Sequence, residues 1–149
     1  MPQFASGVEK CRVGSPTQAV KLADADEGVL VGTRLFLLLH GYEVETAAGG
    51  VECLNKLRRQ SNPVLVLNVE LPWGGGDGVL ALLGADPTLA HIPVILTTNG
   101  PVDRARALGT AAVCRVLPKP VGPDVLLDVI HDLRLRSRIE DTRKEEGWS

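Results

Sequence analysis

Residues 64–80 read VLVLNVELPWGGGDGVL, and this stretch indicates the fold class. Val64–Val69 is apolar except for Asn68, which is typical of a strand covered on both faces of a sheet. A proline, a tryptophan and three glycines follow, and Asp77 is placed to cap the short helix that the next apolar residues predict. A buried strand that runs into a glycine-rich loop presents its last side chain at the edge of the sheet. Here that side chain is an amide.

Short apolar runs alternate with amphipathic segments along the rest of the chain. The remaining strands are predicted at residues 19–23, 42–46, 93–98 and 113–117. Helices are predicted at 26–41, 50–60, 77–85, 101–108 and 122–133. Five strands that alternate with five helices across short turns predict an α/β domain with a doubly wound, five-stranded parallel sheet.

The composition favours one soluble domain and excludes several classes of function. Of 149 residues, 44% are hydrophobic and 23% charged, and the formal net charge is −2, so binding to nucleic acid through phosphate contacts is not expected. Cys11, Cys53 and Cys114 form no CxxC pattern, which predicts reduced thiols and not zinc ligands or disulfides. The most apolar run, Val29–Leu39, contains Arg34 and is too short to span a bilayer. We expect a cytoplasmic protein that does not contact membranes.

Changes in composition divide the chain into three parts. Residues 1–17 mix glycine, serine, proline and charge without periodicity, which predicts a flexible N-terminal tail. Residues 18–135 hold the alternating strands and helices of the predicted domain. Residues 136–149 are rich in charge, and we expect a solvated C-terminal tail, which can extend the last helix and is not a second domain.

Polar residues follow four of the five predicted strands. In a parallel sheet the carboxyl ends of the strands meet at one edge, where ligands bind. The residues expected at that edge are Asp24, Ala25 and Asp26 after the first strand, Asn68 and Glu70 at the third, Thr97, Thr98 and Asn99 at the fourth, and Lys119 and Pro120 after the fifth.

Five motifs, taken in chain order, closely resemble the receiver domain of bacterial response regulators, the CheY-like family. They are LADADEG, HGYEVETAAGG, LNVELP, DPTLAHIPVILTT and LPKPV, and the resemblance extends from Ala19 to Arg134. It implies a flavodoxin-like (βα)5 fold with strand order 2-1-3-4-5. It also implies a function in two-component or phosphorelay signalling.

The resemblance implies a role for each residue of the pocket. In the family, two acids after the first strand and an aspartate that ends the third strand bind Mg²⁺, and that aspartate is phosphorylated. Asp24 matches the first acid, whereas Ala25 replaces the second and Asn68 replaces the phosphoacceptor. Thr98 matches the switch hydroxyl. Lys119 matches the ammonium that binds the phosphoryl group, and its bond to Pro120 is usually cis in the family.

These departures from the family pattern predict a pseudo-receiver without catalytic residues. A neutral amide is a poor nucleophile because its lone pair is delocalised, so Asn68 is not expected to accept a phosphoryl group. Loss of two carboxylates leaves Asp24, with help from Asp26, to bind Mg²⁺ weakly, and no other cofactor is expected. We expect Lys119 to pair with Asp24. For Thr98 two roles stay open, a switch hydroxyl and a hydroxyl that bonds the backbone.

We therefore expect a stand-alone signalling module, not an enzyme, that acts through contacts with a kinase or an output protein. A homodimer is one assembly compatible with this expectation. By analogy with the family, the partner surface includes Arg104, Arg106, Val116 and Asp128, and Val116 stands where the family usually has an aromatic residue. The loop PWGGGDG is two residues longer than the family pattern. Trp73 is either an exposed anchor for a partner or part of a flexible turn.

Two alternatives stay open. In the first, a displaced acid, Glu70 or Asp26, accepts the phosphoryl group. In the second, the protein binds a flavin or a nucleotide, although it lacks GxGxxG and Walker A motifs.

Overall fold

The computed structural model describes residues 19–59, 63–72, 75–108 and 113–145. The expected N-terminal tail, Trp73 and Gly74 lie outside these ranges. The elements in chain order are β1 (Ala19–Ala23), α2 (Glu27–Leu39), β2 (Glu43–Ala47), α3 (Gly50–Leu57), β3 (Val64–Asn68), α4 (Gly75–Ala85), β4 (Val94–Thr98), α5 (Val102–Ala107), β5 (Val113–Pro118) and α6 (Pro123–Glu145).

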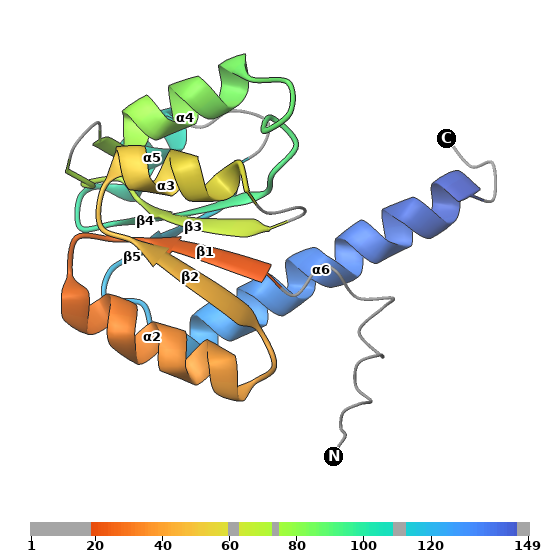
Figure 1. The fold of residues 1–149 in the computed structure, drawn as a ribbon, viewed down its shortest axis with the longest axis horizontal. Coiled ribbons are helices and arrows are strands. Elements are labelled where there is room, and N and C mark those ends of the chain that lie inside the picture. Colours follow the sequence, from red (N-terminus) through yellow and green to blue (C-terminus); the bar gives the residue numbers. More distant parts are fainter. Residues whose placement is uncertain (1–18, 60–62, 73–74, 109–112, 146–149) are drawn as a thin grey trace.

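The five strands form one parallel sheet with the order β2-β1-β3-β4-β5 (Figure 1). This topology confirms the predicted doubly wound fold. Every residue of β1, β3 and β4 is buried, whereas β2 at one edge of the sheet alternates between exposed and buried positions. Central strands are buried on both faces because helices cover both sides, which is why their sequences are almost wholly apolar.

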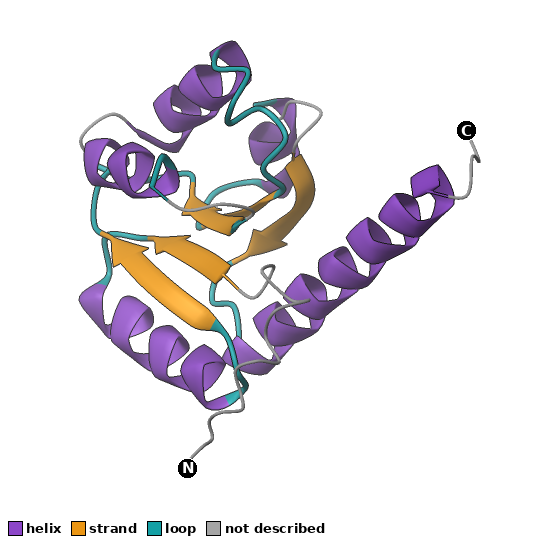
Figure 2. Ribbon diagram, turned by 45° about the vertical axis from the view of Figure 1, so that its right-hand side comes forward, coloured by secondary structure: helices purple, strands orange, loops and turns teal. Residues whose placement is uncertain are grey.

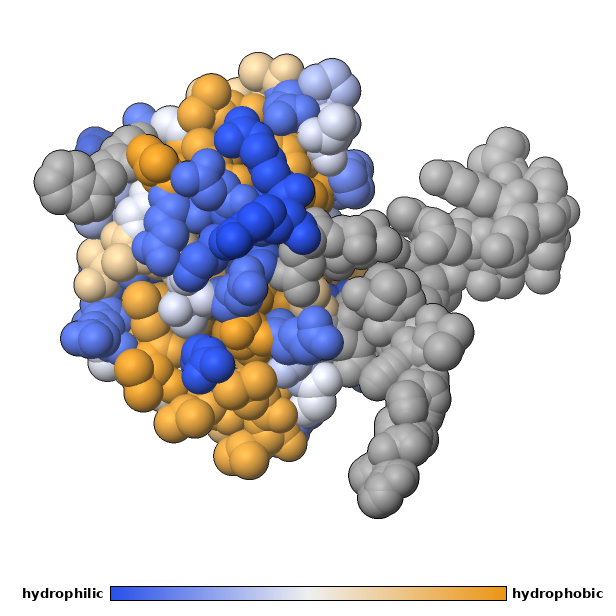
Figure 3. Space-filling model, in the orientation of Figure 1, coloured by the Kyte–Doolittle hydropathy of each residue, from blue (hydrophilic) through white to orange (hydrophobic). Residues whose placement is uncertain are grey.

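The helices form two layers (Figures 1 and 2). α2 and α6 cover one face of the sheet, and α3, α4 and α5 cover the other. Along α2, Leu30, Thr33 and Leu37 are buried, but apolar residues also cover its outward side, as the lower part of Figure 3 shows. A surface helix normally carries polar residues there.

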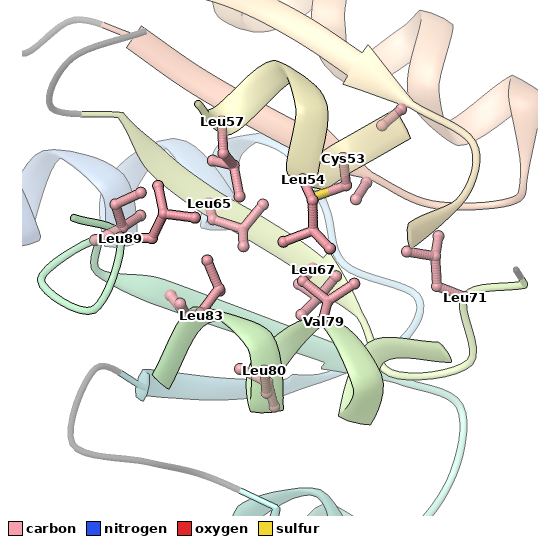
Figure 4. Close-up of a cluster of buried hydrophobic side chains, with 14 of the residues drawn as sticks. Cys53, Leu54, Leu57, Leu65, Leu67, Leu71, Val79, Leu80, Leu83 and Leu89 are labelled. Carbon is pink, nitrogen blue, oxygen red and sulfur yellow. The ribbon is translucent and has the colours of Figure 1, made fainter. Parts of the chain in front are cut away.

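The layer of α3 and α4 packs on the sheet through leucine and valine side chains (Figure 4). Leu54 and Leu57 of α3 meet Val79 and Leu83 of α4 over Leu67 of β3. On the opposite face, side chains of α2 and α6 pack on β1 and β3 in a second cluster. The two clusters fix β1 and β3 in the middle of the sheet, and the polar residues at their carboxyl ends are fixed with them.

Most of the predicted elements differ from the structure by one to three residues at one end or both. β2 is shifted by one residue from the predicted 42–46, and α3 ends at Leu57 and not at 60. α4 begins at Gly75, so Asp77 lies inside the first turn, where its Oδ1 accepts from the N–H of Gly78 at 3.0 Å. The helix begins early because the N–H of Gly76 bonds the carbonyl of Val69 at 3.0 Å, so Asp77 is not the predicted cap.

The last helix crosses the predicted end of the domain. α6 runs to Glu145, through residue 135, and its later turns project away from the sheet (Figure 1). Within the described residues, no helix is both long enough and apolar enough to cross a membrane.

Candidate functional site

The sheet brings the predicted pocket residues to one edge. Asn68 is the last residue of β3 and lies opposite Thr97 of β4, and Thr98 lies opposite Pro118 at the end of β5. Asp24 directly follows β1, and Lys119 follows β5. The parallel register therefore gathers four side chains that are far apart in the sequence, as predicted.

Asp24 and Lys119 form an ion pair in this pocket. Lys119 Nζ lies 2.8 Å from Asp24 Oδ2, and the two side chains are 12% and 5% exposed. Asp24 Oδ1 accepts a hydrogen bond from the N–H of Asp26 at 2.9 Å. The N–H of Lys119 bonds the carbonyl of Thr98 at 2.8 Å, and the Lys119–Pro120 peptide bond is cis. The pairing of Lys119 with Asp24 is confirmed.

Asn68 is buried beside this ion pair. Its Nδ2 lies 3.5 Å from Asp24 Oδ1, a long hydrogen bond, and only 4% of the residue is exposed. Its Oδ1 is buried, and no hydrogen-bond donor of the protein reaches it within the described residues. The amide therefore presents a donor to the acid, where an aspartate would present a second negative charge.

Thr98 and Glu70 form a second polar unit at the same edge. Thr98 Oγ1 donates to Glu70 Oε2 at 2.6 Å and accepts from the N–H of Gly100 at 2.9 Å. The other oxygen of Glu70 accepts from the N–H of Asn99 at 3.1 Å. The Thr98 hydroxyl is therefore bound by a carboxylate of the chain itself and by the backbone. The sequence interpretation named Glu70 and Thr98 without linking them, and their positions at the carboxyl ends of neighbouring strands were the available signal.

The glycine-rich loop approaches the end of β3 very closely. A Cβ atom at Gly76 would lie 2.7 Å from Val69 Cα and 2.8 Å from the carbonyl oxygen of Asn68. Gly75 has a φ of 69°, a conformation that glycine adopts without strain. These two glycines let α4 begin directly behind Asn68, which explains part of the motif. The predicted role of Trp73 lies outside the described residues.

The other two positions after β1 have different environments. Asp26 Oδ1 accepts from the N–H of Val29 at 3.2 Å and caps α2. Ala25 is exposed and offers no polar side-chain atom. Asp24 and Asp26 therefore differ in environment, since Asp24 lies in the pocket and Asp26 caps the start of α2.

The residues of the pocket do not fit a dedicated Mg²⁺ site. Mg²⁺ requires oxygen ligands arranged as an octahedron, most often carboxylates and waters. Asp24 is paired with Lys119, Asp26 caps α2, and Glu70 bonds Thr98. Across the described ranges, no three His, Cys, Asp or Glu side chains gather as a metal site. We assign no chemical step to a metal here.

A hollow of about 250 Å³ lies beside Asp24 and Lys119, between α2 and the start of α6. Val29, Val66 and Leu126 line its apolar part, and Thr33 and Thr97 contribute hydroxyls. The sequence interpretation missed this hollow, since Thr33 looks like an ordinary residue of an apolar helix.

The described residues of the predicted partner surface do not line the hollow beside Asp24 and Lys119. Arg104, Arg106 and Asp128 are exposed, and Arg106 pairs with Asp103 at 3.3 Å. Val116 is half-buried and packs against the core. Their part in binding a partner stays a prediction.

The sequence of this domain matches a known family. The model of the response regulator receiver domain matches residues 20–131. The chain belongs to this family. Two curated relatives are response regulator PleD of Caulobacter vibrioides, 34% identical over 109 residues, and response regulator MprA of Mycobacterium leprae, 32% identical over 127 residues.

These matches cover 71% and 85% of this receiver domain chain, but 24% of PleD and 55% of MprA. The chain thus spans between a quarter and about half of the length of these relatives. Among solved structures, a response regulator receiver domain from Clostridium thermocellum aligns with a TM-score of 0.72 at 23% identity, over 81% of this chain and 97% of the other. This structural likeness supports the fold. The predicted family and the strand order 2-1-3-4-5 are confirmed, and the family places the chain in two-component signalling.

Proposed function

We propose that this receiver domain signals through protein–protein contacts and is not phosphorylated at the position of the usual aspartate. The observation that carries the proposal is the amide of Asn68 at the end of β3, hydrogen-bonded to the Asp24–Lys119 ion pair. An amide has no nucleophilic oxygen suited to attack at phosphorus. The formal charges inside the pocket also nearly cancel, because Asp24 is paired with Lys119, and both side chains are largely buried.

The contacts of Thr98 and Lys119 support the same proposal. These residues match the two that hold a phosphoryl group in the family, and here each one binds a carboxylate of the chain. Thr98 donates to Glu70, and Lys119 pairs with Asp24. The domain therefore holds these side chains in one arrangement without a phosphoryl group. On this proposal Mg²⁺ binds weakly at best, and kinases or output proteins are the partner class.

The first alternative, phosphorylation of Glu70 or Asp26, has less support. Both carboxylates accept hydrogen bonds that fix local structure, Glu70 from Thr98 and Asn99 and Asp26 from Val29. The second alternative, a flavin or nucleotide bound at the carboxyl edge of the sheet, is disfavoured by the small hollow beside Asp24 and Lys119. Its volume of about 250 Å³ is below the range of about 300–1,000 Å³ that is usual for small-molecule sites.

The test compares the wild type with the double variant Ala25→Asp, Asn68→Asp. Both are incubated with Mg²⁺ and acetyl phosphate, and the intact mass is measured. We expect no added phosphoryl group on the wild type and labelling of the double variant, which regains two carboxylates. Labelling of the wild type that disappears in Glu70→Gln or Asp26→Asn would overturn the proposal in favour of a displaced acid. Circular dichroism checks that each variant is folded.

A further inference from the structure

The outward side of α2 is apolar although the helix lies on the surface. Val31, Leu35 and Leu39 are 52%, 53% and 85% exposed, and Leu38 is 38% exposed. Figure 3 shows these apolar side chains gathered over α2 at the lower edge of the molecule. Contiguous exposed apolar surface of this kind usually marks a binding face.

Small and large residues follow a regular spacing along the exposed side of α2. Gly28, Gly32, Leu35 and Leu39 are spaced by four, three and four residues, so they form one stripe along the helix. A Cβ atom at Gly32 would meet nothing within 4 Å, whereas one at Gly28 would lie 3.3 Å from Asp26 Oδ1. The first half of the stripe is therefore low, with open space at Gly32 and the Asp26 carboxylate beside Gly28, and the second half is a pair of protruding leucines.

We infer that α2 pairs antiparallel with α2 of a second copy of this chain. If the two-fold axis passes between Thr33 and Arg34, Gly28 faces Leu39 of the second copy and Gly32 faces Leu35 of the second copy. Each leucine then fills the gap left by a glycine, which is the ridge-into-groove fit of packed helices. The contact is isologous, so it closes at a dimer.

The charges on α2 favour the antiparallel arrangement. Asp26 and Glu27 lie at the start of the helix, and its last turn carries no basic residue. An antiparallel pair places the two acidic first turns at opposite ends of the interface. A parallel pair would place the two acidic turns together. Arg34, the other charged residue of the helix, hydrogen-bonds the carbonyl of Val44 at 3.4 Å, on the side of α2 that faces β2.

A pair of 13-residue helices makes a small interface. Standard stable interfaces bury about 800 Å² per partner. We therefore expect a dimer that dissociates in the micromolar range. This inference depends on the shape of α2 and does not depend on the proposed function.

Sedimentation equilibrium of the whole chain, from low to high micromolar concentration, tests this inference. We expect a monomer–dimer equilibrium for the wild type and a monomer for Leu35→Lys. The matched control is Leu82→Lys on α4, because Leu82 is 52% exposed and lies in the opposite helical layer. The control should dimerise like the wild type. A wild type that stays monomeric, or a Leu35→Lys variant that still dimerises, would refute the inference.

A second variant distinguishes a specific fit between the two α2 helices from non-specific hydrophobic association. Gly32→Leu makes the face more apolar, and the monomer has room for the new side chain. If the gap receives Leu35 of the second copy, Gly32→Leu weakens the dimer at least tenfold, and the added change Leu35→Ala restores it. Stronger association of Gly32→Leu would contradict the proposed fit. Thermal unfolding checks that both variants fold.

Discussion

At the scale of single residues, Asn68 determines the charge of the pocket. Its Nδ2 lies 3.5 Å from Asp24, whose other oxygen is paired with Lys119. An aspartate at this position would place two carboxylates side by side, and like charges this close raise the pKa of at least one of them. With an amide in place, one acid and one base balance each other, and the pocket needs no further cation.

Gly76 is the residue that allows the loop to lie against β3. We predict that Gly76→Ala lowers the free energy of unfolding by about 1–3 kcal/mol, because the new methyl group would overlap backbone atoms at 2.7 and 2.8 Å. Urea unfolding measures the change. Gly78→Ala is the control, since nothing lies within 4 Å of that position and alanine favours a helix by about 0.5–1 kcal/mol. Equal effects of the two substitutions would contradict the role given to the close contact.

Cys53 is a thiol that burial keeps protonated. Cys53 lies on the buried side of α3 and is 1% exposed. Desolvation by this burial raises the pKa of the Cys53 thiol to about 12. We predict that iodoacetamide at pH 8 does not label Cys53 in the folded protein and labels it fully in urea. Peptide mapping by mass spectrometry reads Cys53 separately from the other cysteines. Rapid labelling of folded protein at pH 8 would contradict this prediction.

At the scale of elements, the pairing of β1 with β2 contains a buried charge. Lys21 of β1 is 3% exposed and bonds the carboxylate of Glu45, which lies opposite it on β2. This hydrogen bond lowers the pKa of Glu45 below its usual value of 4.5. The edge strand is thus held to the sheet by an ion pair as well as by its backbone.

We predict that Glu45→Gln lowers the free energy of unfolding at pH 7 by about 1 kcal/mol, because Lys21 stays buried without a charged partner, while the half-exposed Glu45 limits the loss. The folded-state pKa of Glu45 is depressed, so its contribution is present above pH 4.5 and is lost as the pH falls through the folded pKa. The difference between variant and wild type should therefore shrink in acid. Urea unfolding at several pH values measures it, with the exposed Glu43→Gln as control. A difference that grows in acid would contradict the assignment.

At the scale of the whole molecule, α6 closes one layer of the domain and then leaves it. Leu133 and Arg134 are each 8% exposed, and Arg134 donates to the carbonyl of Ala19 at 2.7 Å and lies over the ring of Tyr42. The later turns of α6 project from the body of the domain (Figures 1 and 2). Leu133 and Arg134 are the last residues of α6 that the structure describes as buried, and the boundary at residue 135 stays a prediction.

A chain that ends at Leu135 tests this boundary. We predict that it folds with a free energy of unfolding within about 0.5 kcal/mol of the full chain, since the turns of α6 between residues 135 and 145 project away from the sheet (Figure 1). In contrast, Leu133→Ala should cost about 2–5 kcal/mol, because it empties a buried site in the α2 and α6 layer. Both values come from urea unfolding. Unfolding of the shortened chain would show that residues after 135 belong to the domain.

Much of the fold was predictable because its central strands are buried on both sides. Runs such as VLVLN and VILTT have few alternatives to a covered parallel strand, and the motifs at their ends fixed the family and the strand order. Boundaries that depend on tertiary contacts were less predictable. The start of α4 is set by a hydrogen bond between Gly76 and Val69, and no local pattern encodes that bond.

The sequence by itself therefore determined the alternation of elements, the edge at which the polar residues meet, and the presence of an amide, Asn68, at the end of the third strand. These follow from periodicity and from the chemistry of single side chains. Only the tertiary structure decided which of those residues bond one another, namely Thr98 with Glu70 and Lys21 with Glu45. Such pairs join different strands, so they exist only once the register of the sheet is set. The apolar outward side of α2 likewise became evident only when the sheet fixed which side of the helix it covers.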